Sequence, residues 1–162
     1  MRVVCNAIRE WILLMHKSNI MQFHSSKRFM IVDNNLVSLM LFKKHFSPHF
    51  VSVETANAYG DMLGLLVSGR QPDMILADFD LSQVSGLELL KALKNDRFLQ
   101  HIPIILMAVN FSERMISSAM QAGASACIMK PLSTADYPSF CKDILNLMEE
   151  ADTELAPAAM AV

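Results

Sequence analysis

The amino-acid sequence predicts a doubly wound α/β domain, in which helices cover both faces of a parallel sheet. Apolar runs of about five residues alternate along the chain with longer segments of helical periodicity. Four of these runs are apolar at nearly every position, as expected for strands buried on both faces. Three of the four lead into a charged residue, namely Asp33, Asp78 or Lys130, and the fourth leads into Ala108.

Turn and capping residues divide the chain into ten elements. We expect strands at 28–32, 50–54, 73–77, 103–107 and 125–129, and helices at 35–47, 56–68, 86–95, 112–122 and 134–149. Ser47-Pro48 ends the first helix because proline disfavours continuation, and Ser112 is a good N-cap for the fourth. Gly123 stops that fourth helix, and Pro138 indicates that the fifth begins late, near Asp136. For a doubly wound domain of this kind we expect the strand order 2-1-3-4-5.

The chain is expected to have three parts: an N-terminal helix and linker (1–26), the α/β domain (27–150) and a disordered tail (151–162). Val4, Ile8, Trp11 and Met15 recur at helical spacing, which is typical of an amphipathic helix. The charged pair Arg9-Glu10 interrupts any signal-peptide core. The segment is also too short and charged to span a bilayer, so no membrane association is expected.

Composition agrees with one compact domain in the cytoplasm. The chain has 162 residues, 52% of them hydrophobic, which is enough to bury a substantial core. The net charge is −2 and no Lys/Arg run occurs, so we expect no nucleic-acid partner. Three cysteines without CxxC spacing favour a reducing compartment, and five scattered histidines do not predict a metal site.

The strand ends predict where the functional site lies. Parallel strands share one carboxyl edge, and open α/β folds place their sites at this edge. Asp33, Asp78 and Lys130 should therefore meet in one crevice. Two carboxylates facing one ammonium group are typical of a site that handles phosphate.

Four motifs in register carry a family resemblance: Ile31-Val32-Asp33, Pro72–Asp78 with Gly86–Leu90, Ala122-Gly123-Ala124, and Lys130-Pro131. Over roughly residues 27–149 the chain resembles a chemotaxis-type receiver domain of a response regulator, the phosphoacceptor module of two-component phosphorelay signalling. The resemblance implies a flavodoxin-like fold and a signalling protein rather than an enzyme. It also implies protein partners, such as a histidine kinase or a phosphotransfer protein. Because the tail after Glu150 is too short for an output domain, we expect a stand-alone receiver.

The resemblance also implies roles for individual residues. Asp78 matches the phosphoacceptor, and Lys130 matches the lysine that pairs with phosphate oxygens. The Lys130-Pro131 peptide bond matches a cis bond in the family. Asp33, Asp78 and the backbone carbonyl of Asp80 match ligands of Mg²⁺.

Three departures from the family pattern weaken this site. Asn34 stands in place of a second acid, and a neutral amide should weaken Mg²⁺ binding or abolish it. The carboxylate of Asp80 could return some of the lost charge. Ala108 replaces the hydroxyl residue that bonds the phosphoryl group, and Cys127 replaces the aromatic residue that moves with it. We therefore favour a pseudo-receiver that works without phosphorylation over a slow phosphoacceptor.

Simpler interpretations of the same residues remain open. Asp78 could cap a loop, and Lys130 could serve as the structural counter-ion of Asp33 and Asp78. Cys127 is most simply a small buried apolar residue.

The helix at 35–47 is apolar on nearly every side, which is typical of a buried helix. Leu36, Leu39 and Met40 form one stripe, whereas Val37, Leu41 and Phe42 are expected to face the sheet. We expect the stripe to be an interaction surface, covered either by residues 3–16, including Trp11, or by a second subunit in a homodimer.

Three classes of function follow from these patterns. The first is an atypical receiver acting by protein–protein contact, through the face formed by the fourth helix, fifth strand and fifth helix. The second is a dimerisation or scaffold subunit. The third, a flavodoxin-like cofactor carrier, is the weakest, because Asn34-Asn35-Leu36 follows the first strand where a phosphate-binding loop would be needed.

Overall fold

Five parallel strands form the centre of the computed structural model, which describes residues 26–155, with side chains described as far as Met148. The strands are β1 (Arg28–Val32), β2 (Ser52–Ala56), β3 (Met74–Asp78), β4 (Ile104–Ala108) and β5 (Ala126–Met129). They are hydrogen-bonded in the order β2-β1-β3-β4-β5, which confirms the predicted topology.

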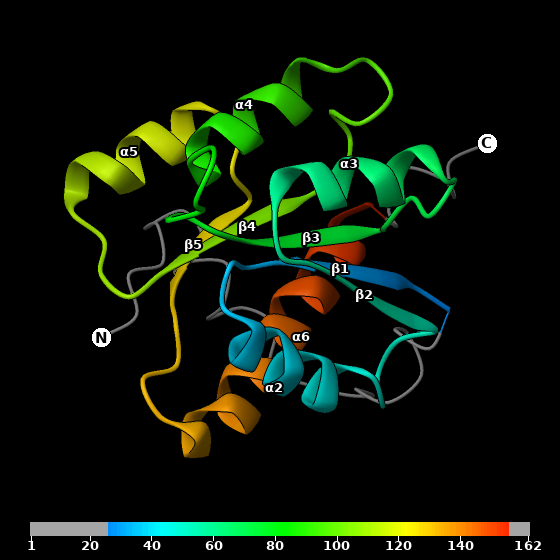
Figure 1. The fold of residues 1–162 in the computed structure, drawn as a ribbon, viewed down its shortest axis with the longest axis vertical. Helices are drawn as coiled ribbons and strands as arrows, with labels where there is room; N and C mark the ends of the chain where they lie inside the picture. Colours follow the sequence, from blue (N-terminus) through cyan, green and yellow to red (C-terminus); the bar gives the residue numbers. More distant parts are fainter. Residues whose placement is uncertain (1–25, 156–162) are drawn as a thin grey trace.

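Five helices cover the two faces of this sheet. They are α2 (Leu36–Phe46), α3 (Tyr59–Val67), α4 (Gly86–Asn95), α5 (Glu113–Gln121) and α6 (Tyr137–Leu155), with a short 3-10 turn at Thr134–Asp136 before α6. Helices α3, α4 and α5 lie on one face, and α2 and α6 lie on the other (Figure 1). The doubly wound arrangement predicted from the sequence is therefore present.

The alternation of side chains along β1 separates two apolar cores. Phe29 and Ile31 point toward α2 and α6, whereas Met30 and Val32 point toward α3, α4 and α5. The first core is rich in aromatic rings, and Phe29 stacks on Phe50 with ring centroids 4.8 Å apart. The second is almost entirely aliphatic. Because every residue of β3 and β4 is buried, the sheet holds the site edge rigidly between the two cores.

The strand register brings the carboxyl ends level with one another. Val32 pairs with Ala77, Asp78 with Met107, and Ala108 with Met129. Residues at or just after these strand ends therefore face the same crevice.

Most element boundaries lie within one residue of the prediction, and larger differences occur at β2, at α6 and at α3, which begins at Tyr59 rather than residue 56. β2 begins at Ser52 rather than residue 50, because the Phe50 side chain is packed in the aromatic core before the ladder starts. The last helix begins at Tyr137, close to the predicted late start, but it continues to Leu155 instead of ending near 149.

Some predicted features lie outside the described residues. These are the N-terminal helix with Trp11, and residues 156–162 of the predicted tail. Within residues 26–155, no helix combines the length and the apolar character needed to cross a membrane.

Candidate functional site

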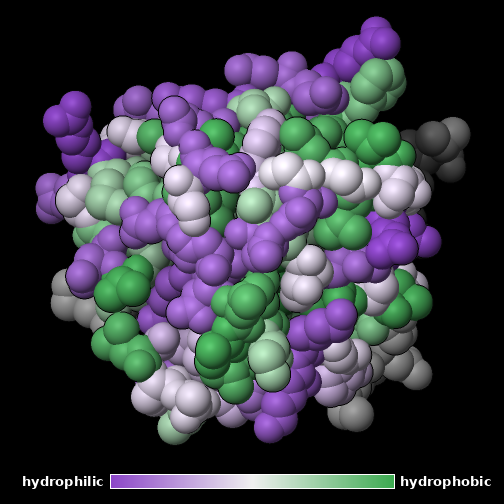
Figure 2. Space-filling view, viewed as in Figure 1, coloured by the Kyte–Doolittle hydropathy of each residue, from purple (hydrophilic) through white to green (hydrophobic). Residues whose placement is uncertain are grey.

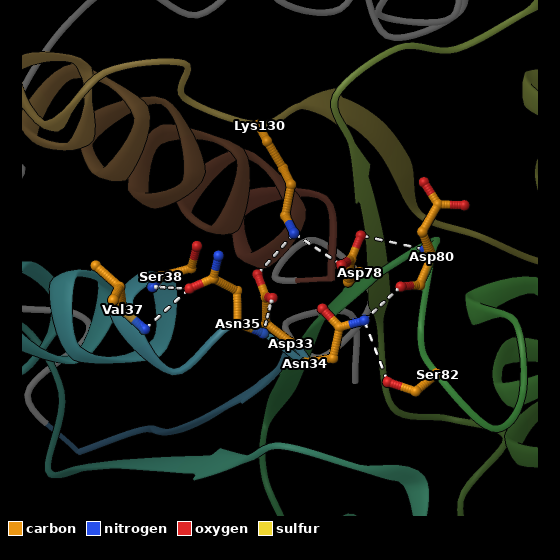
Figure 3. Close-up of polar contacts among 9 residues, drawn as sticks. All are labelled: Asp33, Asn34, Asn35, Val37, Ser38, Asp78, Asp80, Ser82 and Lys130. Atoms are coloured by element: carbon orange, nitrogen blue, oxygen red, sulfur yellow. Dashed lines mark hydrogen bonds and ion pairs between the residues drawn. The ribbon is translucent and has the colours of Figure 1, made fainter.

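Three charged side chains meet at the carboxyl edge of the sheet (Figure 3). Asp33 follows β1, Asp78 is the last residue of β3, and Lys130 follows β5. The Nζ atom of Lys130 lies 2.8 Å from Oδ2 of Asp33 and 2.7 Å from Oδ2 of Asp78. We call these three residues the acceptor cluster. The strand ends therefore come together as the sequence predicted.

The two carboxylates of the acceptor cluster are buried, so their negative charges lose most of their hydration. Asp33 is fully buried and Asp78 is 4% exposed, so both carboxylates depend on Lys130 for compensation. Oδ2 of Asp33 accepts no well-aligned hydrogen bond and has the Lys130 ammonium as its ion-pair partner.

The pKa values of Asp33 and Lys130 reflect the opposing effects of burial and ion pairing. Burial raises the pKa of Asp33 above its ordinary value, although Lys130 and the backbone N–H of Asn35 oppose the shift. Burial is also the largest single influence on Lys130 and lowers its pKa. The hydrogen bonds and negative charges of Asp33 and Asp78 together outweigh that effect, so the pKa of Lys130 is raised and the ammonium form is stabilised.

The segment after β1 fixes Asp33 by local hydrogen bonds. Oδ1 of Asp33 accepts a hydrogen bond of 2.8 Å from the backbone N–H of Asn35. The side chain of Asn35 in turn caps α2 by accepting from the N–H groups of Val37 and Ser38. An Asx-type turn and a helix N-cap therefore follow each other directly, which is a common use of these residues.

The segment after β3 closes tightly behind Asp78. Oδ1 of Asp78 accepts from the backbone N–H of Asp80 at 3.2 Å, and the N–H of Gly86 donates to the carbonyl of Phe79 at 2.8 Å. A Cβ atom on Gly86 would lie 2.3 Å from the carbonyl oxygen of Asp78, so glycine is required there. Ser85 then begins α4 with a capping box.

The side chain of Lys130 reaches the acceptor cluster without the cis Lys130-Pro131 peptide bond that the resemblance implied. The backbone N–H of Lys130 donates to the carbonyl of Ala108 at 2.8 Å, which holds the end of β5 beside β4. No cis peptide bond occurs in residues 26–155, so the bond between Lys130 and Pro131 is trans and the cis prediction is wrong.

Asn34 makes contacts that the sequence reasoning missed. Its Nδ2 group donates to the backbone carbonyl of Asp80 at 2.9 Å and to Oγ of Ser82 at 3.3 Å. The one available signal was that Asn34 and the Asp80 carbonyl both match positions of the family's Mg²⁺ site. The Asp80 carboxylate is exposed and points away from Asn34 in Figure 3, so it does not replace the missing acid in this arrangement.

The observed donor set is a poor fit for the implied Mg²⁺. Asp33 and Asp78 are in place, but Lys130 lies between them. The Asp80 carbonyl already accepts a hydrogen bond, and Asn34 turns a nitrogen donor toward it rather than an oxygen. In the described part of the chain, no three His, Cys, Asp or Glu side chains are grouped so that they could hold a metal ion.

The positions of Ala108 and Cys127, which we call the switch positions, are both buried and apolar. Ala108 ends β4 and is 1% exposed, and Cys127 lies in β5 among the aliphatic core residues. Beside the crevice, the rings of Phe79 and Phe111 make an edge-to-face contact with centroids 5.8 Å apart, which the sequence did not predict.

Helix α2 presents a different apolar face from the one predicted. Leu39 is only 6% exposed and packs in the aromatic core with Phe42, so its assignment to the interaction stripe is wrong. The exposed side chains are Leu36 (62%), Val37 (64%) and Met40 (73%). We call these three residues the α2 patch. Figure 2 shows apolar surface over α2.

The comparisons with known proteins agree with this architecture. Residues 29–139 match the response regulator receiver domain. The two-component response regulator ORR1 of rice, Oryza sativa, is 37% identical over 109 residues, covering 65% of this chain and 47% of ORR1. The chain therefore spans about half the length of that relative.

Two further matches cover almost the whole of the proteins concerned. The polar-differentiation response regulator DivK of Brucella ovis is 33% identical over 127 residues, covering 78% of this chain and 99% of DivK. A CheY-like receiver domain protein from Methanospirillum hungatei superposes with a TM-score of 0.63 at 26% identity, covering 78% of this chain and 99% of that one.

Proposed function

Because this chain belongs to the response-regulator receiver family, we propose that it is a pseudo-receiver that signals by protein–protein contact without phosphorylation. Receiver domains are signalling modules that work with histidine kinases or phosphotransfer proteins in phosphorelays. We propose that this chain has kept such partners and is not an enzyme.

One observation carries the proposal. Lys130 pairs with both buried carboxylates, while the positions that would support a phosphoryl group hold Asn34 and Ala108. The acceptor cluster is thus a closed ion network. The simpler sequence interpretation of Lys130, as the counter-ion of two acids, accounts for every contact it makes in the crevice.

Phosphorylation of this site would require transfer of a phosphoryl group from a phosphohistidine to Asp78. An oxygen of Asp78 would attack the phosphorus of a phosphohistidine, forming an O–P bond as the P–N bond breaks. The imidazole nitrogen leaves with the electron pair and takes up a proton. Phosphoryl transfer depends on positioning and on cations around the equatorial oxygens. Here Lys130 is the one cationic side chain that contacts Asp78 among the described residues.

Signal output after any phosphoryl transfer would also be weakened. A hydrogen bond to a charged group contributes roughly 1.5–3 kcal/mol. Because Ala108 has no hydroxyl, this free energy is not available to shift the equilibrium between inactive and active conformations on phosphorylation. It corresponds to about one to two powers of ten in a two-state equilibrium. Cys127 has no ring to follow such a movement.

Exposed apolar side chains around the crevice support contact with a protein partner. The α2 patch begins three residues after Asp33, and Val109 and Leu132 are exposed just beyond β4 and β5. We propose that a helical phosphotransfer protein or kinase domain docks over this rim. The face formed by α5, β5 and α6 would then contact the output partner.

Intact mass after incubation with Mg²⁺ and a small phosphodonor tests the proposal. We expect no phosphate-sized gain on the wild-type chain, nor on Asp61→Ala, a control that removes an exposed carboxylate from α3. A gain that persists in Asp61→Ala and disappears in Asp78→Ala would establish a working acceptor and overturn phosphorylation-independent action.

The α2 patch also supports a second candidate function, that of a dimerisation or scaffold subunit. Three adjacent exposed apolar side chains on one helix form a surface on which a second copy of the chain or residues 3–16 would pack. Mass measured over a range of concentrations distinguishes the two candidates. A dimer that dissociates in Val37→Lys supports the scaffold function, whereas a monomer at every concentration excludes it.

A further inference from the structure

Two loops at the mouth of the crevice are joined by one side chain, Asn34. Its amide nitrogen lies 2.9 Å from the carbonyl oxygen of Asp80 and 3.3 Å from Oγ of Ser82, residues that are 46 and 48 positions away in the chain. Figure 3 shows these contacts running from the β1–α2 segment to the β3–α4 segment.

The chemistry of the partners fixes the orientation of the amide. A backbone carbonyl oxygen can only accept a hydrogen bond, so the atom that faces Asp80 must be the nitrogen of Asn34. Rotating the amide by half a turn would place two acceptors against each other. The nitrogen is therefore committed to the loop and cannot bind a cation.

An acid at position 34 would behave in the opposite way. A carboxylate would face the Asp80 carbonyl acceptor to acceptor, close to the two carboxylates of the acceptor cluster. Because Lys130 is already paired with those two carboxylates, a third negative charge would need a bound cation for compensation. The amide removes that requirement, because it supplies both the neutral charge and the donor.

We propose that Asn34 is a positioning residue that takes the place of a divalent cation, cross-linking the β1–α2 and β3–α4 loops. The loop from Phe79 to Ser85 is thereby held at three points. Gly86 packs against the backbone of Asp78 at one end, the capping box holds Ser85, and Asn34 holds the middle. The order of this loop is then built into the fold and does not respond to Mg²⁺. This inference does not depend on whether Asp78 is phosphorylated.

Hydrogen exchange of the backbone amides of residues 80–85, with and without Mg²⁺, tests the inference. In the wild-type chain the rates should be the same in both conditions. In Asn34→Ala they should rise about fivefold, the equivalent of one ordinary hydrogen bond, with no change in β3 and β4. In Asn34→Asp they should be fast without Mg²⁺ and slow with it.

Two controls separate positioning from general destabilisation. Asn110→Ala removes an exposed amide from the β4–α5 loop and should leave residues 80–85 unchanged. Ser82→Ala removes only the longer contact and should have a smaller effect than Asn34→Ala. Wild-type loop exchange that slows in Mg²⁺ would overturn the inference, and so would an Asn34→Ala loop with wild-type rates.

Discussion

The acceptor cluster and the switch positions lie on adjacent strands of one sheet edge, yet they differ in nearly every physical respect. Asp33, Asp78 and Lys130 form a charged network whose distances are all below 3 Å. Ala108 and Cys127 are small and buried, and Cys127 packs in the aliphatic core. The difference supports the proposal that the charges of the receiver crevice persist here without its switch, because the charged network would also stabilise the fold. The following predictions test this comparison.

The largest effect should come from breaking the acceptor cluster. Lys130→Met leaves two buried carboxylates facing each other without compensation, which should cost about 3–5 kcal/mol of unfolding free energy at neutral pH. Lys91→Met, which removes an exposed lysine of α4, should change stability by less than about 0.5 kcal/mol. Urea denaturation measures both. A loss below about 1 kcal/mol in Lys130→Met would show that the network is not structural.

The pH dependence of the same network has a definite sign. The folded chain holds the pKa of Lys130 above its ordinary value of 10.5. The contribution of the ammonium to stability is therefore fully present below that pH and is lost as the pH rises through the raised pKa. Unfolding free energy measured from neutral to strongly alkaline pH should fall in this window for the wild type. The fall should be smaller in Lys130→Met.

A smaller loss of stability is expected from substitution of Gly86, which packs against the backbone of Asp78. Gly86→Ala places a Cβ atom 2.3 Å from the carbonyl oxygen of Asp78, which should cost about 1–3 kcal/mol. Gly64→Ala is the matched control, because a Cβ there meets nothing within 4 Å inside α3. It should be neutral or stabilising by up to about 1 kcal/mol. Equal thermal shifts in the two variants would contradict the close packing behind Asp78.

The smallest expected change in stability comes from substitution at the switch positions. Ala108→Thr restores a hydroxyl at the end of β4, and without a partner that buried group should cost about 1–2 kcal/mol. Combined with Cys127→Tyr, it should make the amide spectrum of α5 respond to a phosphodonor, provided that Asp78 is present. If the α5 amide spectrum of the wild-type chain already responds to the phosphodonor, the acceptor cluster and the switch positions do not differ in function as proposed.

The sequence predicted the buried strands and the meeting of Asp33, Asp78 and Lys130, because strand periodicity and the shared carboxyl edge of parallel strands determine both. The strand order belonged to the flavodoxin-like fold that the family resemblance implied. The sequence did not predict which side of α2 is buried. Leu36, Val37, Leu39 and Met40 are all apolar, so hydrophobicity alone cannot orient the helix, and Leu39 is selected by its fit against the aromatic core. The contact of Asn34 with Asp80 was also missed, because it joins residues 46 positions apart through a backbone carbonyl.

The most direct test is the backbone amide NMR spectrum of the wild-type chain with Mg²⁺ and beryllofluoride, a mimic of the phosphoryl group. We expect no chemical-shift changes beyond residues 78–86 and the end of β1, with α5 and β5 unaffected. Changes that extend through Ala108 and Cys127 into α5, and that are absent in Asp78→Ala, would show that the switch works without its usual residues and would contradict the account.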